Sequence, residues 1–390
     1  MEIKGTMLRL FHLMNDKKAS DLFLSCGAPI TIKINGNAVP VNQTILMPDT
    51  ISTLLNEILT AEQLHELDEA RELNTRCGIP NVGVFRISCF YQRGTQAAVI
   101  RYIPSDIPRF ETLQLPDVLK DVIMEKRGLI LMVGATGSGK STTLTSMLDY
   151  RNENKTGHIL TLEDPVEFLF KNKKSIVNQR EVGTDTKAFH IALKNALRQA
   201  PEVIFIGEIR DKDTMSQAIA YAQSGHLCIA TLHANNSYHA MSRIISFYPL
   251  ENRPALLSDL SVTLKCVISQ RLVKKPDGGR VPAVEVLLNS RHISELIEKG
   301  DLNEIKEAME KSMVPGSQTF EQCLFYLYRN NIITLDEALA NADSANNLQW
   351  LINNATAEEA KPEEQKTTPD PTRSLAPGTS FSEFTLKMDG

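Results

Sequence analysis

A lysine that follows closely spaced glycines is the pattern in this chain with the clearest chemistry. In the segment GATGSGKST, four residues separate Gly134 from Gly139, and Lys140 and Ser141 follow directly. This is the P-loop pattern, in which backbone N–H groups cradle phosphates, the lysine reaches the β- and γ-phosphates and the hydroxyl binds Mg²⁺. An apolar strand pattern precedes the segment and a helical pattern follows it, as the mechanism requires. We therefore predict a nucleotide site at Gly134, Ala135, Thr136, Gly137, Ser138, Gly139, Lys140, Ser141 and Thr142.

The nucleotide is assigned by elimination. A guanine-reading Asn-Lys-x-Asp motif is missing downstream, because the segment NKKS at Asn172 lacks the acidic residue. The sequence therefore favours ATP, with Mg²⁺ as its counter-ion.

Three further apolar segments end in acidic residues or a histidine. HILTLEDP ends at Glu163 and Asp164, VIFIGE ends at Glu208, and HLCIATLH ends at His233. In an open parallel sheet, ligands bind beyond the carboxyl ends of the strands, so these side chains should converge on the γ-phosphate. We expect Glu208 to face Mg²⁺ and its waters, Glu163 to orient or deprotonate the attacking water, and His233 to sense the phosphate.

The competing interpretation is that each acid caps a following helix, and it is strongest for Asp164, which precedes Pro165. His226 lies seven residues before His233, at the other end of the same predicted strand, and is interpreted as structural.

Two arginines are predicted to face each other in an early hairpin. If the turn of FRISCFYQRGTQAAVIRYIP is centred on Arg93 and Gly94, Arg86 and Arg101 lie directly opposite each other. Like charges in that arrangement destabilise a sheet, which invites an anion between them. A solvated pair of arginines is the alternative. A phosphate bound by a neighbouring subunit is the natural anion, which would make these residues arginine fingers in trans.

Composition limits the class of protein. The chain has 390 residues, 42% of them hydrophobic and 23% charged, as in a soluble globular protein of two or three compact units. Its net charge of −5 gives no electrostatic reason to expect nucleic acid. Six scattered cysteines form no CxxC pair, which indicates reduced thiols in the cytoplasm. The longest apolar run, at 128–133, is too short to cross a bilayer.

The elements that must position these residues are predicted to fall into two units. Residues 1–103 read as a small α+β unit, and 104–117, with three prolines, as a linker. From 118 to 354, strands and helices alternate and then give way to a helix-rich region from about 252, which predicts an α/β fold with a largely parallel sheet. Residues 355–390 read as a disordered tail.

Together the motifs resemble a known family. GATGSGKST, TLEDPVEF, VIFIGEIRD and HLCIATLHANN, in this order, resemble the Walker A, Asp box, Walker B and His box of the secretion ATPases (GspE/PilT) of type II secretion and type IV pili. The resemblance covers roughly 5–345. It implies a hexamer whose subunits have a PAS-like N-terminal domain and a RecA-like ATPase domain with a helical C-terminal region.

The resemblance also implies roles for single residues. Glu163 matches the Asp-box glutamate, Glu208 the Walker B acid and His233 the His-box residue. Arg86 and Arg101 match the family's N-terminal arginines. The last two implied positions are Arg198, which matches a further arginine of the pattern, and Lys194, which stands where many members have arginine.

Within the family the chain resembles a pilus retraction motor. It lacks the long N-terminal extension and the tetracysteine zinc element of assembly ATPases, and it has NSRHISELIEKG (Asn289–Gly300) where PilT-type motors have an AIRNLIRE-like segment. This implies a cytoplasmic ATPase for twitching motility, working at the inner-membrane platform protein beside a PilT-like paralogue. An assembly or type II secretion ATPase, or an accessory subunit with dispensable hydrolysis, remain the alternatives.

Overall fold

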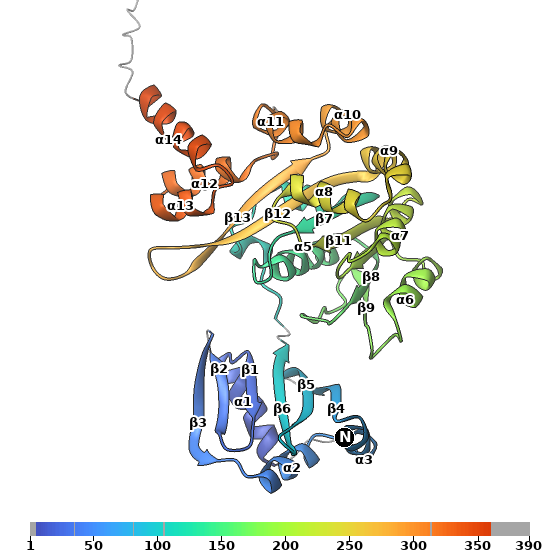
Figure 1. The fold of residues 1–390 in the computed structure, drawn as a ribbon, viewed down its shortest axis with the longest axis vertical. Helices are drawn as coiled ribbons and strands as arrows, with labels where there is room; N and C mark the ends of the chain where they lie inside the picture. Colours follow the sequence, from blue (N-terminus) through green and yellow to red (C-terminus); the bar gives the residue numbers. More distant parts are fainter. Residues whose placement is uncertain (1–4, 35, 81, 104–105, 313, 360–390) are drawn as a thin grey trace, which may run out of the picture.

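The computed structural model describes residues 5–34, 36–80, 82–103, 106–312 and 314–359, with side chains up to 354. Within these ranges the chain forms two sheets, each with its own helices. The sheet formed by the N-terminal residues is drawn at the bottom of Figure 1, and the sheet formed by the later residues is drawn above it. The α/β fold class predicted from the sequence is confirmed.

In the described N-terminal part, the first sheet is antiparallel and has the strand order β3-β2-β1-β6-β5-β4. Its strands are β1 (Asp21–Leu24), β2 (Pro29–Ile34), β3 (Asn37–Ile45), β4 (Glu72–Ile79), β5 (Gly83–Gln92) and β6 (Thr95–Ile103). Its helices are α1 (Thr6–Lys17), α2 (Pro48–Asn56) and α3 (Ala61–Ala70). Buried side chains of all three helices pack with those of the strands into one hydrophobic core, which makes this part the expected α+β unit.

The β5–β6 hairpin has the predicted register. Arg93 and Gly94 form the turn with φ values of 47° and 77°, and Arg86 lies directly opposite Arg101. Two consecutive positive φ angles are the requirement of a two-residue type I′ turn, which an arginine followed by glycine can adopt.

The second sheet has the order β13-β12-β7-β11-β10-β8-β9 in the described part of the chain. Its strands are β7 (Gly128–Val133), β8 (Gly157–Glu163), β9 (Ser175–Glu181), β10 (Val203–Ile206), β11 (Leu227–Leu232), β12 (Leu264–Lys274) and β13 (Arg280–Leu288). All neighbouring pairs are parallel except β12 with β13. The four strands predicted to carry the site, β7, β11, β10 and β8, are therefore adjacent and run in one direction.

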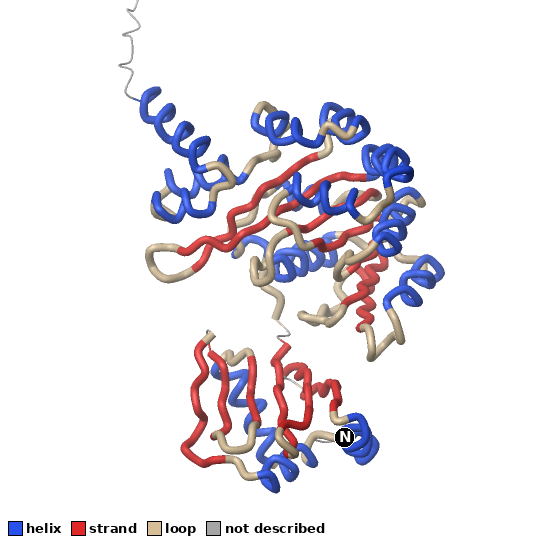
Figure 2. Tube along the Cα trace, viewed as in Figure 1, coloured by secondary structure: helices blue, strands red, loops and turns tan. Residues whose placement is uncertain are grey.

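Helices cover both faces of this sheet (Figure 2). The α-helices of this described part are α4 (Val118–Ile123), α5 (Lys140–Asn154), α6 (Phe189–Ala196), α7 (Lys212–Gln223), α8 (Ser237–Ser246), α9 (Arg253–Thr263), α10 (Arg291–Lys299), α11 (Ile305–Glu310), α12 (Phe320–Arg329), α13 (Leu335–Asn341) and α14 (Ala345–Glu359), and the last three pack at one end of the β12–β13 hairpin. α4 and α5 pack on one face, and α6 to α11 pack on the other. β7 is buried along its whole length, as expected for a parallel strand covered on both sides.

The prediction of a helix-rich region from about 252 is wrong for residues 264–288. These form the long antiparallel hairpin β12–β13, which adds two strands to the edge of the sheet (Figure 2). The signal was present in the sequence, because two runs rich in Val, Ile and Leu flank the turn-forming residues Pro276-Asp277-Gly278-Gly279.

The predicted linker and the start of the predicted tail both contain regular secondary structure. Within 104–117, a 3-10 turn at Phe110–Thr112 buries Phe110 in the core beneath α4 and α5. Helix α14 extends through Glu359, five residues into the predicted tail, and residues 360–390 lie outside the described part. In the described part of the chain, every helix is too short or too polar to span a membrane.

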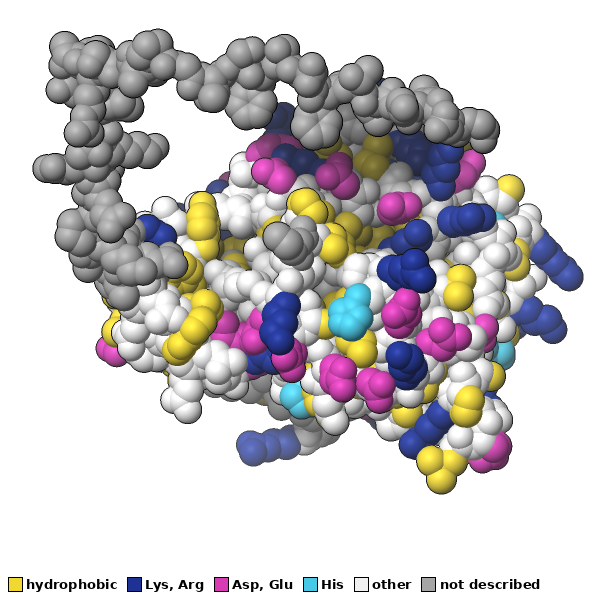
Figure 3. Space-filling view, turned by 90° about the horizontal axis from the view of Figure 1, so that it is seen from above, with side chains coloured by type: hydrophobic (Ala, Val, Ile, Leu, Met, Phe, Trp, Pro, Cys, Tyr) yellow, Lys and Arg dark blue, Asp and Glu magenta, His cyan; other side chains and the backbone are white. Residues whose placement is uncertain are grey.

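The face seen from above carries charges of both signs. Lys and Arg side chains are interspersed there with Asp and Glu (Figure 3). Phosphate backbones are bound by clustered basic side chains, so this face offers no support for a nucleic-acid partner.

Candidate active site

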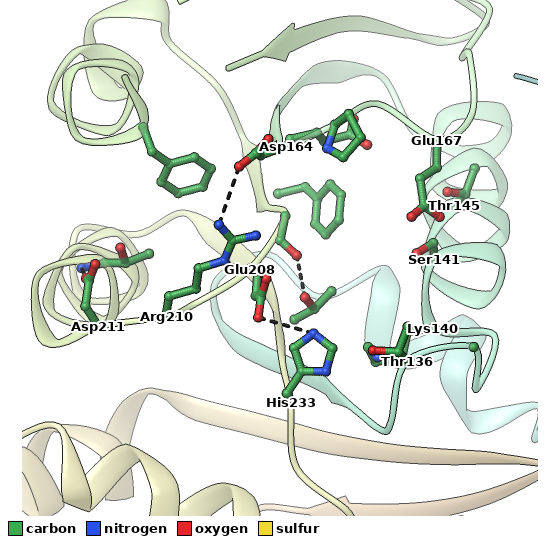
Figure 4. Close-up of a pocket in the computed structure, with 18 residues that line it drawn as sticks. Thr136, Lys140, Ser141, Thr145, Asp164, Glu167, Glu208, Arg210, Asp211 and His233 are labelled. Carbon is green, nitrogen blue, oxygen red and sulfur yellow. Dashed lines mark hydrogen bonds and ion pairs between the residues drawn. The ribbon is translucent and has the colours of Figure 1, made fainter. Parts of the chain in front are cut away.

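The carboxyl ends of β7, β8, β10 and β11 border a cleft of about 390 Å³. Lys140, Ser141 and Thr145 of α5 line one side of the cleft, and Glu208, Arg210, Asp164 and His233 line the other (Figure 4). Residues from four segments of the sequence thus meet at one edge of the sheet, as the strand pattern predicted.

The P-loop geometry depends on its glycines. Gly137 and Gly139 have φ values of 80° and 85°, in the left-handed region that glycine adopts without strain. A Cβ on Gly134 would lie 2.5 Å from the Ser138 Oγ and 2.7 Å from the backbone oxygen of Gln270. The loop can therefore keep its close packing against β12 only with glycine at this position.

The lysine of the loop is buried. Lys140 Nζ donates hydrogen bonds to the carbonyl oxygens of Gly134, at 2.7 Å, and Ala135, at 2.9 Å. Burial lowers the pKa of Lys140, and the negative charge of Glu208 partly opposes this shift. The two hydrogen bonds hold the amine against the loop, and Lys140 lines the cleft together with Thr136 and Gly137, where a phosphate would bind.

Glu208 faces two cationic or polar side chains. Its Oε2 accepts a hydrogen bond of 2.8 Å from Arg210 Nε, and its Oε1 lies 3.2 Å from His233 Nε2. Helix α7 is capped instead by Asp211, whose Oδ1 accepts from the backbone N–H of Thr214. The helix-cap interpretation of Glu208 is therefore excluded. Arg210 was missed in the sequence, although its place two residues after Glu208 was a usable signal.

Glu163 is the buried carboxylate of the site. Its Oε1 accepts hydrogen bonds from Thr161 Oγ1, at 2.6 Å, and from Gln179 Nε2, at 3.2 Å. Burial raises the pKa of Glu163 from 4.5 to about 7 and outweighs the opposing effect of these two hydrogen bonds. A carboxyl group that titrates near neutral pH is suited to accept a proton from a water molecule.

Asp164 caps no helix, because the described residues 164–174 contain none. Its Oδ2 lies 3.5 Å from Arg210 Nη1, so one guanidinium contacts the acids that follow both β8 and β10. Arg210 thereby links the acidic residues that follow the two neighbouring strands.

The two histidines of β11 lie at opposite ends of the strand. His233 lines the cleft, whereas the Nδ1 of His226 lies 3.0 Å from Ser224 Oγ at the other edge of the sheet. The structure therefore agrees with the prediction that His233 alone of the two faces the site.

The structure provides partners for the hairpin arginines within the same chain. Arg101 Nε donates to the buried Asp21 Oδ1 at 2.8 Å, and Arg86 Nη2 donates to the carbonyl oxygen of Val166 at 3.0 Å. Burial lowers the pKa of Arg86. Arg101 therefore has a counter-charge within its own chain, so the inference that the pair invites a further anion does not hold for Arg101 in this arrangement. Arg86 contacts the segment that follows β8, because Val166 lies three residues after Glu163.

Arg198 is not brought to the cleft. It lies in the 3-10 turn Leu197–Gln199, exposed to solvent and outside the residues that line the cleft, and Lys194 is likewise exposed on α6. Besides Arg86, Arg76 of β4 also joins the N-terminal part to the ATPase part, since its Nη2 lies 2.9 Å from Oδ1 of Asp185, in the turn after β9.

A P-loop between a buried parallel strand and its helix, with two carboxylates and a histidine at the neighbouring strand ends, defines a P-loop ATPase. The chain belongs to the family described as "Type II/IV secretion system protein", whose profile matches residues 80–324.

Two curated relatives from Pseudomonas aeruginosa are similar over most of the chain. The type IV pilus ATPase PilU is 47% identical over 345 residues, which cover 88% of this chain and 90% of PilU. The retraction ATPase PilT is 39% identical over 320 residues, covering 82% of this chain and 93% of PilT. The similarity to PilU and PilT confirms the resemblance to the pilus motor ATPases within the family that the sequence predicted.

A solved structure shows the same fold. The crystal structure of the pilus retraction motor PilT with bound ADP has a TM-score of 0.83 and 40% sequence identity, and the alignment covers 89% of this chain and all of that one.

Proposed function

We propose that this protein hydrolyses ATP to power or assist the retraction of type IV pili. The observation that carries the proposal is the convergence of Lys140, Glu163, Glu208 and His233 on one cleft at the ends of adjacent parallel strands. The similarity to PilU and PilT over nearly their whole lengths supports the link to pilus retraction.

In the proposed reaction, the backbone N–H groups of Gly134–Thr142 and the amine of Lys140 bind the phosphates of ATP. Glu163, with a pKa of about 7, orients the attacking water and accepts its proton. His233 senses the γ-phosphate and contacts Glu208, so the loss of the γ-phosphate on hydrolysis alters the surroundings of Glu208 after β10.

The residues of the cleft fit a magnesium ion. The hydroxyl of Ser141 and the carboxylate of Glu208 both line the cleft, and oxygen donors of this kind are the ligands Mg²⁺ prefers. Ser141 would hold the ion directly and Glu208 partly through water. When bound, Mg²⁺ neutralises charge on the β- and γ-phosphates.

The proposal extends to assembly and partners. Six copies form a ring in which Arg86, and Arg101 once it exchanges its contact with Asp21, serve the nucleotide of a neighbour, and Arg198 contributes at the same interface. The ring works in the cytoplasm, at the inner-membrane platform protein of the pilus, beside a PilT-like paralogue. The exposure of Arg198 on a single chain leaves its side chain available for such an interface.

The alternative functions have less support. An assembly or type II secretion ATPase is disfavoured by the near full-length match to the type IV pilus ATPase PilU and the retraction ATPase PilT. An accessory subunit with dispensable hydrolysis is disfavoured because both carboxylates, the lysine and the histidine are in place.

Replacement of the P-loop lysine tests the proposal. Lys140→Ala should abolish hydrolysis, because a charge that stabilises the transferred phosphoryl group is lost. Lys126→Ala, at an exposed lysine before β7, is the matched control and should hydrolyse ATP like the wild type. Cells that carry only Lys140→Ala should retract pili like cells in which the gene is deleted. Wild-type hydrolysis by purified Lys140→Ala would contradict the site assignment.

A further inference from the structure

Two consecutive residues of β12, Gln270 and Arg271, bind different parts of the protein. Gln270 is buried and spans the P-loop and its helix: its Nε2 donates to the Ser138 carbonyl at 2.8 Å, and its Oε1 accepts from Thr143 Oγ1 at 2.8 Å. Side chains alternate between the faces of a strand, so Arg271 points the other way. Strand β12 therefore touches the nucleotide loop with one residue and a different set of groups with the next.

Arg271 gathers three backbone or side-chain oxygens around one guanidinium. Its Nη2 donates to the carbonyl of Asn235 at 3.2 Å and to Asp343 Oδ1, and its Nη1 donates to the carbonyl of Asn341. The guanidinium lies 4.0 Å from the ring centroid of the fully buried Phe320. The planar fork of arginine is suited to such a multidentate site, whereas lysine would contact it as a point charge.

These partners belong to two parts of the protein. Asn235 lies two residues after His233, in the loop between β11 and α8. Asn341 ends α13 and Asp343 precedes α14, so both belong to the C-terminal helices α12, α13 and α14, which form their own hydrophobic cluster on the far end of the β12–β13 hairpin. Arg271 thus joins the loop behind the phosphate-sensing histidine to these C-terminal helices.

A second contact joins the loop after His233 to the C-terminal helices. Asn236 Nδ2 donates to the other oxygen of Asp343, Oδ2, at 2.7 Å, and Asn236 also caps α8 by accepting from the backbone N–H of His239. Asp343 therefore uses both carboxylate oxygens to hold the loop that follows His233, one through Arg271 and one directly.

We infer that Arg271 is a positioning residue of the ATPase reaction, which fixes the loop behind His233 against the C-terminal helices so that nucleotide turnover and the placement of those helices are coupled. This inference rests on the ATPase function proposed above. Arg271 acts on the reaction through His233 and Glu208, which lie 3.2 Å apart at the cleft. A shift of about 1 Å in a group that orients a reactant is enough to slow a reaction by up to ~100-fold.

Steady-state kinetics give the first test. Arg271→Gln should lower kcat by about tenfold and leave the KM for ATP within about twofold, because the P-loop contacts made by Gln270 remain. Asp343→Asn keeps the size of the side chain and removes its charge, so it should lower kcat in the same direction by a smaller factor. Arg291→Gln is the matched control, since Arg291 is 94% exposed and should behave like the wild type.

Hydrogen exchange separates coupling from simple stabilisation. In the wild type and in Arg291→Gln, a non-hydrolysable ATP analogue should change amide exchange in residues 335–348, and this response should be absent in Arg271→Gln. This arm needs only nucleotide binding, so it holds even if the wild type proves not to hydrolyse ATP, a result that would instead overturn the proposed function. No response at 335–348 in the wild type, or a response that Arg271→Gln and Asp343→Asn both retain, would overturn the inference.

Discussion

The acids at the ends of β8 and β10 and the arginines of the β5–β6 hairpin are both pairs of like charge, and the protein accommodates them differently. Glu163 is buried, bound by neutral donors, and has its pKa raised to about 7. Glu208 keeps a cationic partner, Arg210. The arginines lie opposite each other, yet each turns to its own partner, Asp21 for Arg101 and a backbone carbonyl for Arg86.

The difference shows where charge is available for chemistry. Arg101 is 61% exposed and is the counter-charge of the buried Asp21, so in this structure its charge serves the N-terminal sheet. Glu163 carries an unfavourable desolvation that the fold tolerates at the site. A buried acid that titrates near neutral pH in a cleft indicates a functional site. An exposed arginine that already has an ion-pair partner does not indicate one by itself.

Among the substitutions that test this comparison of acids and arginines, the largest loss of activity is expected at Glu208. Glu208→Gln should keep ATP binding but slow hydrolysis by about a hundredfold or more, the loss typical of a charge-positioning or acid–base group. Nucleotide binding and phosphate release by the purified variant measure the two effects separately. Glu298→Gln, at an exposed glutamate on α10, is the control. Loss of both nucleotide binding and the fold would identify Glu208 as a structural acid.

An intermediate effect is expected from the titration of Glu163. Because its pKa is about 7, kcat should fall by about tenfold for each pH unit below 7 as the carboxylate becomes protonated. Glu163→Gln should be much slower and should lose this pH dependence. A wild-type profile that stays flat from pH 7 to lower values would contradict a role for Glu163 as the base.

The ionisation of Glu163 should also change the stability of the protein: kcat should rise with pH, whereas the free energy of unfolding should fall. The folded-state pKa lies above the ordinary value of 4.5, so the folded protein favours the protonated form. This contribution is complete below pH 4.5 and is lost as the pH rises through about 7. Urea unfolding should therefore show the wild type losing stability relative to Glu163→Gln across that window.

The smallest effect, and the one that most directly tests the arginine pair, comes from mixing variants. If Arg86 serves a neighbour's nucleotide, Arg86→Ala and Lys140→Ala, each inactive alone, should recover activity together. Roughly a quarter of the interfaces in a randomly mixed ring would combine an intact P-loop with an intact Arg86. Phosphate release measured on the mixture reports this recovery. Activity equal to the sum of the separate variants would show that Arg86 acts within its own chain or has no part in hydrolysis.

Local sequence patterns determined much of this protein. The P-loop, the four strands that end at Val133, Glu163, Ile206 and Leu232, and the register of Arg86 against Arg101 all follow from short-range rules of periodicity and turn chemistry. Parallel pairing then places the strand ends at one edge, so the convergence of Lys140, Glu163, Glu208 and His233 was predictable as well, whereas Arg210 was missed and Arg198 does not line the cleft. The β12–β13 hairpin was predictable in the same way but was missed.

Only the tertiary structure decided which partner each charged group has. Arg101 meets Asp21, 80 residues away, and Arg271 meets Asp343, 72 residues away. Sequence separation carries no information about such pairs, because they form where separately folded elements pack. The same holds for the pKa of Glu163, which depends on how completely neighbouring strands and helices exclude water from its carboxylate. The sequence supplied the chemical groups of this site and their order along the sheet, and packing set their charges and their partners.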